Sequence, residues 1–190
     1  MVLESILYQV NQVTKKVNKA LFELRFIKTY TYTQALRKQL IETLIIPHFT
    51  YCSFEYLDLT CELKIHLQRL SNACIRYIYD LRKEIRITPY RNGLGWMRTE
   101  IRRTYFMALI MYKVKRLKKP SYLIALFQPY VSLRPTWGVR QDLKVTHVAP
   151  TSFQGEGAPL WNSLPTRIRD LTSLSFFKRR IREHLIDGDG

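Results

Sequence analysis

The sequence predicts a mainly α fold: a helical bundle over residues 1–128, followed by a smaller irregular α+β lobe, residues 129–190, closed by a C-terminal helix. Three observations support this prediction. Apolar residues recur at steps of three and four along most of the first 128 residues, as they do on one side of an α-helix. Proline and glycine gather between residues 130 and 165, where apolar residues alternate over short stretches. Helical spacing returns after Ser173.

The bundle is organised around residues 63–81. One stripe of this helix is predicted to face the core and consists of Leu63, Leu67, Leu70, Cys74, Ile78 and Leu81. The opposite side carries amides, guanidinium groups and a phenol, from Gln68, Arg69, Asn72, Arg76 and Tyr79. Such a side either lies in water or follows a phosphate backbone.

Two helices precede this one. The first has an apolar stripe from Leu3 to Leu24, with Lys15 and Lys19 on its far side. The second is expected to begin after Thr33, which is a suitable N-cap. Its predicted apolar side consists of Leu36, Leu40, Ile41 and Leu44, and Pro47 should end it. An aromatic connection is then expected over residues 48–56.

Five more segments follow. Residues 89–95 predict a turn, with Asn92 and Gly93 as the clearest signal. A helix over 99–117 should turn Ile101, Tyr105, Ala108, Leu109 and Tyr112 inward, and a short helix follows Pro120. Short strands and loops are expected over 130–165, including the alternation Leu143, Val145 and Val148. The last helix should bury Phe176, Phe177, Ile181 and Leu185 and expose Lys178, Arg179, Arg180 and Arg182.

The composition favours a folded protein with an anionic partner. Lys and Arg number 31 against 15 for Asp and Glu, a net charge of +16. Nucleic acid is the first candidate partner and an anionic membrane surface the weaker one, while a basic surface without such a partner is the alternative. No apolar run approaches the roughly 20 residues of a membrane span, and no signal peptide is recognised. Three cysteines at irregular spacing fit a reducing compartment, so we expect an intracellular protein, nuclear or cytoplasmic.

The sequence predicts no catalytic residue, metal or other cofactor. No two carboxylates form a tight pair for divalent ions, and no glycine-rich phosphate loop or nucleophile elbow occurs. Histidine and cysteine gather in one region but without a C-x₂₋₄-C pair; these residues are His48, Cys52, Cys61, His66 and Cys74. Cys74 lies on the apolar stripe, where a buried thiol needs no ligand role. We therefore expect no small-molecule substrate.

Nucleic-acid contact is the remaining possibility. Gln68, Asn72 and Arg76 stand four residues apart and form a line along one helix side. Amides and guanidinium groups can contact phosphate, although a solvated helix side is the alternative. The candidate nucleic-acid-binding residues are Lys15, Lys19, Gln68, Arg69, Asn72 and Arg76. Trp161 is predicted to be a packing anchor, with base stacking as the alternative.

Three blocks carry a family resemblance: LIIPHFTYCS (44–53), LQRLSNACIRYI (67–78) and GAPLWNSLPTRIR (157–169), followed by Phe177-Lys178. In this order they resemble the C-terminal part of reverse transcriptases from non-LTR retrotransposons, most of all the jockey-like elements. LIMYK (109–113) and PSYL (120–123) match further blocks.

The resemblance implies the polymerase thumb and the region beyond it, without the palm and its catalytic aspartates. The intact parent would be an RNA-directed DNA polymerase, with its divalent metal in the palm, whereas this chain is expected not to polymerise alone. Departures from the family pattern are Glu55-Tyr56, where an aromatic of a V-W pair is expected, and Ser71, where glutamine is frequent. The helical stripe already runs at the first residues, from which we expect the middle of a longer helix, and the resemblance implies a gene fragment or decayed copy of a mobile element.

The implied partner is an RNA/DNA template–primer duplex, held without base readout. The missing palm is a second candidate partner. The competing hypothesis is a non-catalytic helical protein-interaction module.

Overall fold

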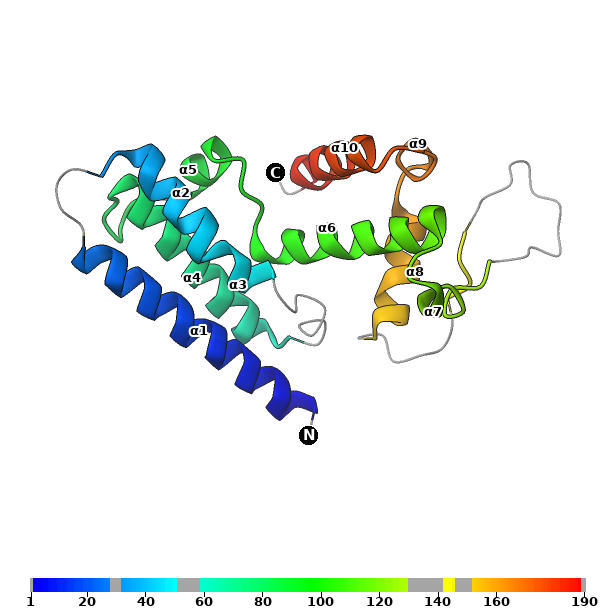
Figure 1. The fold of residues 1–190 in the computed structure, drawn as a ribbon, viewed down its shortest axis with the longest axis horizontal. Helices are drawn as coiled ribbons and strands as arrows, with labels where there is room; N and C mark the ends of the chain where they lie inside the picture. Colours follow the sequence, from blue (N-terminus) through cyan, green and yellow to red (C-terminus); the bar gives the residue numbers. More distant parts are fainter. Residues whose placement is uncertain (1, 28–31, 51–58, 130–141, 146–151, 189–190) are drawn as a thin grey trace. The chain divides into compact units, whose positions relative to one another are not determined.

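The computed structural model describes residues 2–27, 32–50, 59–129, 142–145 and 152–188, which form helices and no extended strand (Figure 1). The predicted mainly α class is therefore confirmed. The helices are α1 (Val2–Phe26), α2 (Gln34–Leu44), α3 (Ile46–Thr50), α4 (Cys61–Tyr79), α5 (Thr88–Gly93), α6 (Thr99–Tyr112), the π-helix η1 (Lys113–Leu117), α7 (Ser121–Ile124), α8 (Phe153–Ser163), α9 (Thr166–Arg169) and α10 (Leu174–Asp187). The chain divides into two compact units, Met1–Glu100 and Ile101–Gly190.

The core of the first unit lies where α1 packs along α4. The buried stripe of α1 consists of Ile6, Val10, Val13, Val17, Leu21 and Leu24. The buried apolar residues of α4 include Leu67, Leu70, Cys74, Ile75 and Ile78, which confirms the predicted core side of this helix. Each such side chain contributes about 1.5–3 kcal/mol when fully buried, so the two stripes supply much of the stability of this unit.

The second helix begins as predicted, and its inward side agrees in part with the predicted one, since Leu40 and Ile41 pack in the core. Thr33 caps α2, because its Oγ1 accepts a hydrogen bond from the Leu36 amide at 3.3 Å. Ile41 and Ile45 are fully buried, whereas Leu36 and Leu44 are exposed, so the predicted inward side of this helix was wrong for the two leucines. Ile41 and Ile45 stand four residues apart and form a row of their own.

Two proline segments predicted to be non-helical form short helices. Pro47 is the second residue of α3 and Pro89 the second residue of α5. Proline is tolerated in a first turn because the amide it lacks would have no partner there. The turn after α5 comes at Gly95, with φ of 65°, and not at Asn92-Gly93 as predicted. The rest of the predicted aromatic connection, residues 51–58, lies outside the described residues.

The core of the second unit is a set of stacked aromatic rings. Phe177 of α10 stacks on Tyr112 of α6 with ring centroids 4.3 Å apart, and on Trp161 of α8 at 6.3 Å. Phe177 and Ile181 are buried as predicted, whereas Phe176 is 53% exposed. Trp161 is 3% exposed, so the predicted packing role is confirmed.

The prediction of strands and loops with little helix over 130–165 was wrong for α8. Ser152 caps this helix, since its Oγ accepts a hydrogen bond from the Gly155 amide at 2.9 Å. A Cβ at Gly157 would lie 2.9 Å from Sδ of Met111 and 3.3 Å from the Phe127 ring, so this glycine allows close packing and does not make a turn. In the described part of the expected lobe, pairing amounts to one isolated antiparallel bridge, between Pro129 and Leu143.

The two compact units divide after Glu100, whereas the sequence suggested a boundary at residue 128. The reason lies in α6 and η1, which carry buried side chains of the second unit, among them Ala108, Met111, Tyr112 and Val114. A break in composition near 129 therefore marks a change of local structure and not the edge of a core.

Candidate nucleic-acid interface

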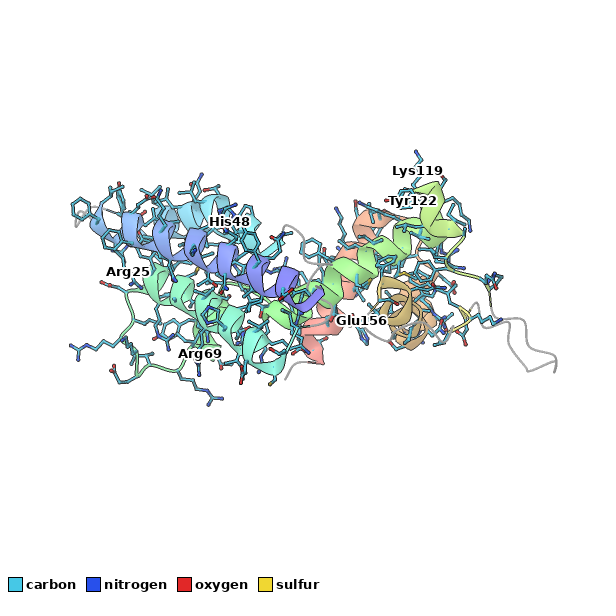
Figure 2. All side chains as sticks on the ribbon, turned by 90° about the horizontal axis from the view of Figure 1, so that it is seen from below. Arg25, His48, Arg69, Lys119, Tyr122 and Glu156 are labelled. Carbon is cyan, nitrogen blue, oxygen red and sulfur yellow. The ribbon has the colours of Figure 1, made fainter. Side chains whose placement is uncertain are left out.

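A cationic groove of about 640 Å³ lies in the first unit, between the C-terminal ends of α1 and α4. Its lining includes four cationic side chains and one carboxylate. The lining residues are Arg25, Ala73, Arg76, Tyr77, Asp80, Leu81, Arg82 and Lys83. Figure 2 labels Arg25 near the end of α1. We refer to this feature as the cationic groove.

The end of α4 brings the cations of the groove together. Asp80 adopts the left-handed conformation (φ 56°, ψ 43°), and the amides of Asp80 and Leu81 both donate to the carbonyl of Arg76. This C-cap reverses the chain, so that Arg82 and Lys83 follow directly beside Arg76. Nη2 of Arg76 then donates to the Lys83 carbonyl at 3.1 Å, which holds the guanidinium in place.

The cations of the groove are poorly compensated by protein groups. Arg25, Arg82 and Lys83 form no ion pair within the described part of the chain. Nε of Arg76 is buried and has no hydrogen-bond partner there. Guanidinium groups bind phosphate oxygens through charge-assisted hydrogen bonds, so a phosphate in the groove would supply the missing acceptors.

Tyr77 forms the inner wall of the groove. Burial raises the pKa of its phenol above 10.0, and the nearby Arg37 cation opposes this increase. The hydroxyl donates to the Leu24 carbonyl at 3.3 Å, which ties α4 to α1. This neutral phenol therefore adds no negative charge to the groove.

Gln68 and Asn72, two of the predicted site residues, are half-buried and hydrogen-bonded within the chain. Nε2 of Gln68 donates to Oδ1 of Asn72 at 2.9 Å. Oε1 of Gln68 accepts from the Thr99 amide at 3.0 Å and from its hydroxyl at 3.2 Å. Thr99 is the first residue of α6, so the pair holds the start of that helix.

The other predicted site residues lie on exposed surface or in the groove. Lys15, Lys19 and Arg69 are exposed, and Figure 2 labels Arg69 on α4. Lys19 lies 3.8 Å from Glu23, an exposed pair that contributes little. Of the six predicted residues, Arg76 is the one that lines the cationic groove.

The sequence reasoning missed Arg25, Arg82 and Lys83 as groove residues. Arg82 and Lys83 come directly after the last core residue of the predicted helix. This position could have indicated them, because basic residues commonly lie near the free carbonyls at a helix end. Arg25 gave no such signal, since its position beside α4 depends on how the two helices pack.

The second unit carries its own basic cluster at η1. Arg116 donates to the Arg169 carbonyl at 3.0 Å and pairs with Asp170 at 2.8 Å, so it is engaged in the protein. Burial lowers the pKa of Lys115, and the nearby Lys118 and Arg116 cations lower it further. Lys118 closes the π-helix in the left-handed conformation. Figure 2 labels Lys119, which follows it.

The basic side of α10 is exposed as predicted, with Lys178, Arg179, Arg180 and Arg182 in solvent. Part of this charge is already engaged. Arg180 pairs with Glu183 at 3.0 Å, and the guanidinium of Arg179 lies 5.2 Å from the centre of the Phe176 ring. This helix is therefore a less suitable candidate for anion binding than the cationic groove.

Histidine, cysteine and carboxylate side chains are the groups that could hold a metal ion in the residues that the structure covers. No group of three or more His, Cys, Asp or Glu side chains could hold a metal ion among them. His66 shares a 3.0 Å hydrogen bond with Thr14, and Cys74 is fully buried in the core. Cys52 lies outside the described residues.

None of the described helices is both long and apolar enough to cross a membrane.

Comparison of the chain with protein-family models, curated proteins and solved structures finds no match.

Proposed function

We propose that this chain holds an RNA–DNA duplex through its phosphate backbone, without reading the base sequence and without catalysing synthesis. The observation that carries the proposal is the cationic groove. Its lining includes one carboxylate, Asp80, and four cations, Arg25, Arg76, Arg82 and Lys83. Contacts of this kind neutralise phosphates and release counterions, which supplies affinity that does not depend on sequence.

The proposed role is that of a polymerase thumb, from a reverse transcriptase of a jockey-like non-LTR retrotransposon. The sequence blocks 44–53, 67–78 and 157–169 support this origin by resemblance. Under the proposal, Arg76 contacts phosphate, whereas Gln68 and Asn72 act indirectly by holding the start of α6.

The experiment is a binding titration of the full chain with a blunt RNA–DNA hybrid over a series of salt concentrations. Binding should weaken steeply with salt, and Arg76→Ala and Arg82→Ala should each reduce the log–log slope by about one. Arg86→Ala is the matched control, because Arg86 is an exposed arginine in the same loop that does not line the groove. Equal losses in all three variants would assign binding to overall charge, and absent binding at low salt would refute the proposal.

A helical protein-interaction module is the second candidate function. It is favoured by exposed apolar side chains on α1, namely Leu7, Tyr8, Phe22 and Phe26. Patches of this kind drive association when they are contiguous. Analytical ultracentrifugation separates the two candidates, since stable self-association that Phe22→Ala abolishes would favour the interaction module over a monomeric nucleic-acid binder.

A further inference from the structure

Two phenylalanines project from the outer side of α1 near its C-terminal end. Phe22 is 69% exposed and Phe26 is 84% exposed, while the opposite side of the helix is buried against α4. Residues four apart lie next to each other on a helix surface, so the two rings form one exposed aromatic pair. Neither ring is required by the core of the unit.

The aromatic pair lies beside the cationic groove. Arg25, which lines the groove, stands three residues after Phe22 and directly before Phe26. Residues three apart on a helix have Cβ atoms about 5–6 Å apart, so Phe22 is the surface neighbour of Arg25, and Phe26 joins the cationic groove through its place beside Phe22. Cations that can hold phosphates and flat rings that can accept bases therefore adjoin on one surface.

We propose that Phe22 and Phe26 stack on unpaired bases of a nucleic-acid strand whose phosphates lie in the cationic groove. This inference rests on the proposed function and narrows its ligand to a strand with a single-stranded segment. Bases within a duplex cover each other's faces, whereas unpaired bases offer theirs to an aromatic side chain.

The positive charge of the cationic groove favours a polyanion, and not an apolar protein, as the molecule that binds here. The groove residues Arg25, Arg82 and Lys83 form no ion pair within the described residues, and Lys15 extends the exposed positive charge along α1. An apolar partner would cover the two rings and leave these cations uncompensated. A single strand matches both features, because it combines phosphates with exposed bases.

The test compares two single-stranded oligonucleotides of equal length and charge, one of oligothymidine and one of abasic residues, with the full chain. The base-containing strand should bind about tenfold more tightly, since stacking on an aromatic ring is a substantial term for each base. The double variant Phe22→Ala/Phe26→Ala should abolish this difference and leave the salt dependence of the abasic strand unchanged.

Tyr8→Ala is the matched control. Tyr8 is a 62% exposed aromatic residue on α1, about 21 Å along the helix from Phe22, and does not line the groove. This variant should retain the preference for bases. Equal affinity of the native chain for both strands, or a preference that survives the double variant, would overturn the inference, while salt-dependent binding of the blunt RNA–DNA hybrid would still uphold the proposed function. Absence of binding to both strands and to the blunt hybrid would refute both.

Discussion

The side-chain oxygen of Gln68 accepts two hydrogen bonds from Thr99, one from its amide at 3.0 Å and one from its hydroxyl at 3.2 Å. A side-chain acceptor at the first amides of a helix acts as an N-cap supplied from elsewhere in the chain. Gln68 in α4 thereby positions the start of α6. The sequence had instead predicted that Gln68 contacts nucleic acid.

Gln68→Ala should lower the free energy of unfolding by about 1 kcal/mol, in the range of a lost helix cap. Urea unfolding followed by circular dichroism measures this change. Arg69→Ala is the neighbouring control, since Arg69 is exposed, and should cost little stability. A stability loss no larger in Gln68→Ala than in Arg69→Ala would contradict the capping role.

Gly157→Ala should destabilise the second unit by about 1–3 kcal/mol through overpacking. The added Cβ would lie 2.9 Å from Sδ of Met111 and 3.3 Å from the Phe127 ring. Gly93→Ala is the matched control in a helix, because its Cβ would meet Tyr79 Oη at an ordinary 3.8 Å. Thermal unfolding of the two variants should therefore differ, and an equal midpoint would show that Met111 can move aside without cost.

Asn162→Leu should weaken the attachment of residues 142–145. Nδ2 of Asn162 donates to the Leu143 carbonyl at 2.9 Å, and the Leu143 amide donates to Oδ1 at 2.8 Å. Because Leu143 is buried, loss of both bonds should cost about 1–3 kcal/mol. Hydrogen exchange should show faster exchange of the Leu143 amide. Unchanged exchange there would mean that the other contacts of the segment, among them the 2.8 Å ion pair of Arg169 with Asp142 and the bridge between Pro129 and Leu143, are enough to hold it.

Tyr77→Phe should change the response to alkaline pH. Burial raises the pKa of this phenol above 10.0, so between its unfolded and folded values the unfolded chain loses the proton first. Fewer protons are then bound in the unfolded state, and stability falls as pH rises past 10. The variant has no phenol, so its free energy of unfolding should fall less steeply above pH 10. Near neutral pH the variant should be less stable than the native chain, because it lacks the hydrogen bond to the Leu24 carbonyl. Unfolding free energies measured between pH 8 and 11 test this, and parallel curves would refute it.

The long helices could be predicted because their apolar spacing alone defines them. The stripe of Leu67, Leu70, Cys74 and Ile78 needs no knowledge of the rest of the chain. Helix α8 could not be predicted in this way, since Gly155, Gly157 and Pro159 are turn residues by local preference. Gly157 is required there by the approach of Met111 and Phe127, which is a property of the packed unit.

The candidate site was predictable only in part for the same reason. Arg76 follows from its place on the polar side of α4. Arg25 belongs to the groove because the end of α1 packs beside the end of α4, and Arg82 and Lys83 belong to it because Asp80 reverses the chain. A polar residue on a helix can face solvent, bind phosphate or contact the start of a neighbouring helix, and the sequence alone does not distinguish these. Gln68 contacts the start of a neighbouring helix.

The buried Cys74 gives the protein an internal reporter of its own opening. All three cysteines precede residue 100, so the second unit contains no thiol. In a chain with Cys52→Ser and Cys61→Ser, a thiol reagent can modify Cys74 only after the first unit opens, because its side chain is fully buried in the core of that unit. The rate of labelling then measures how often the first unit opens, and protection by an added oligonucleotide would measure ligand binding without any attached probe.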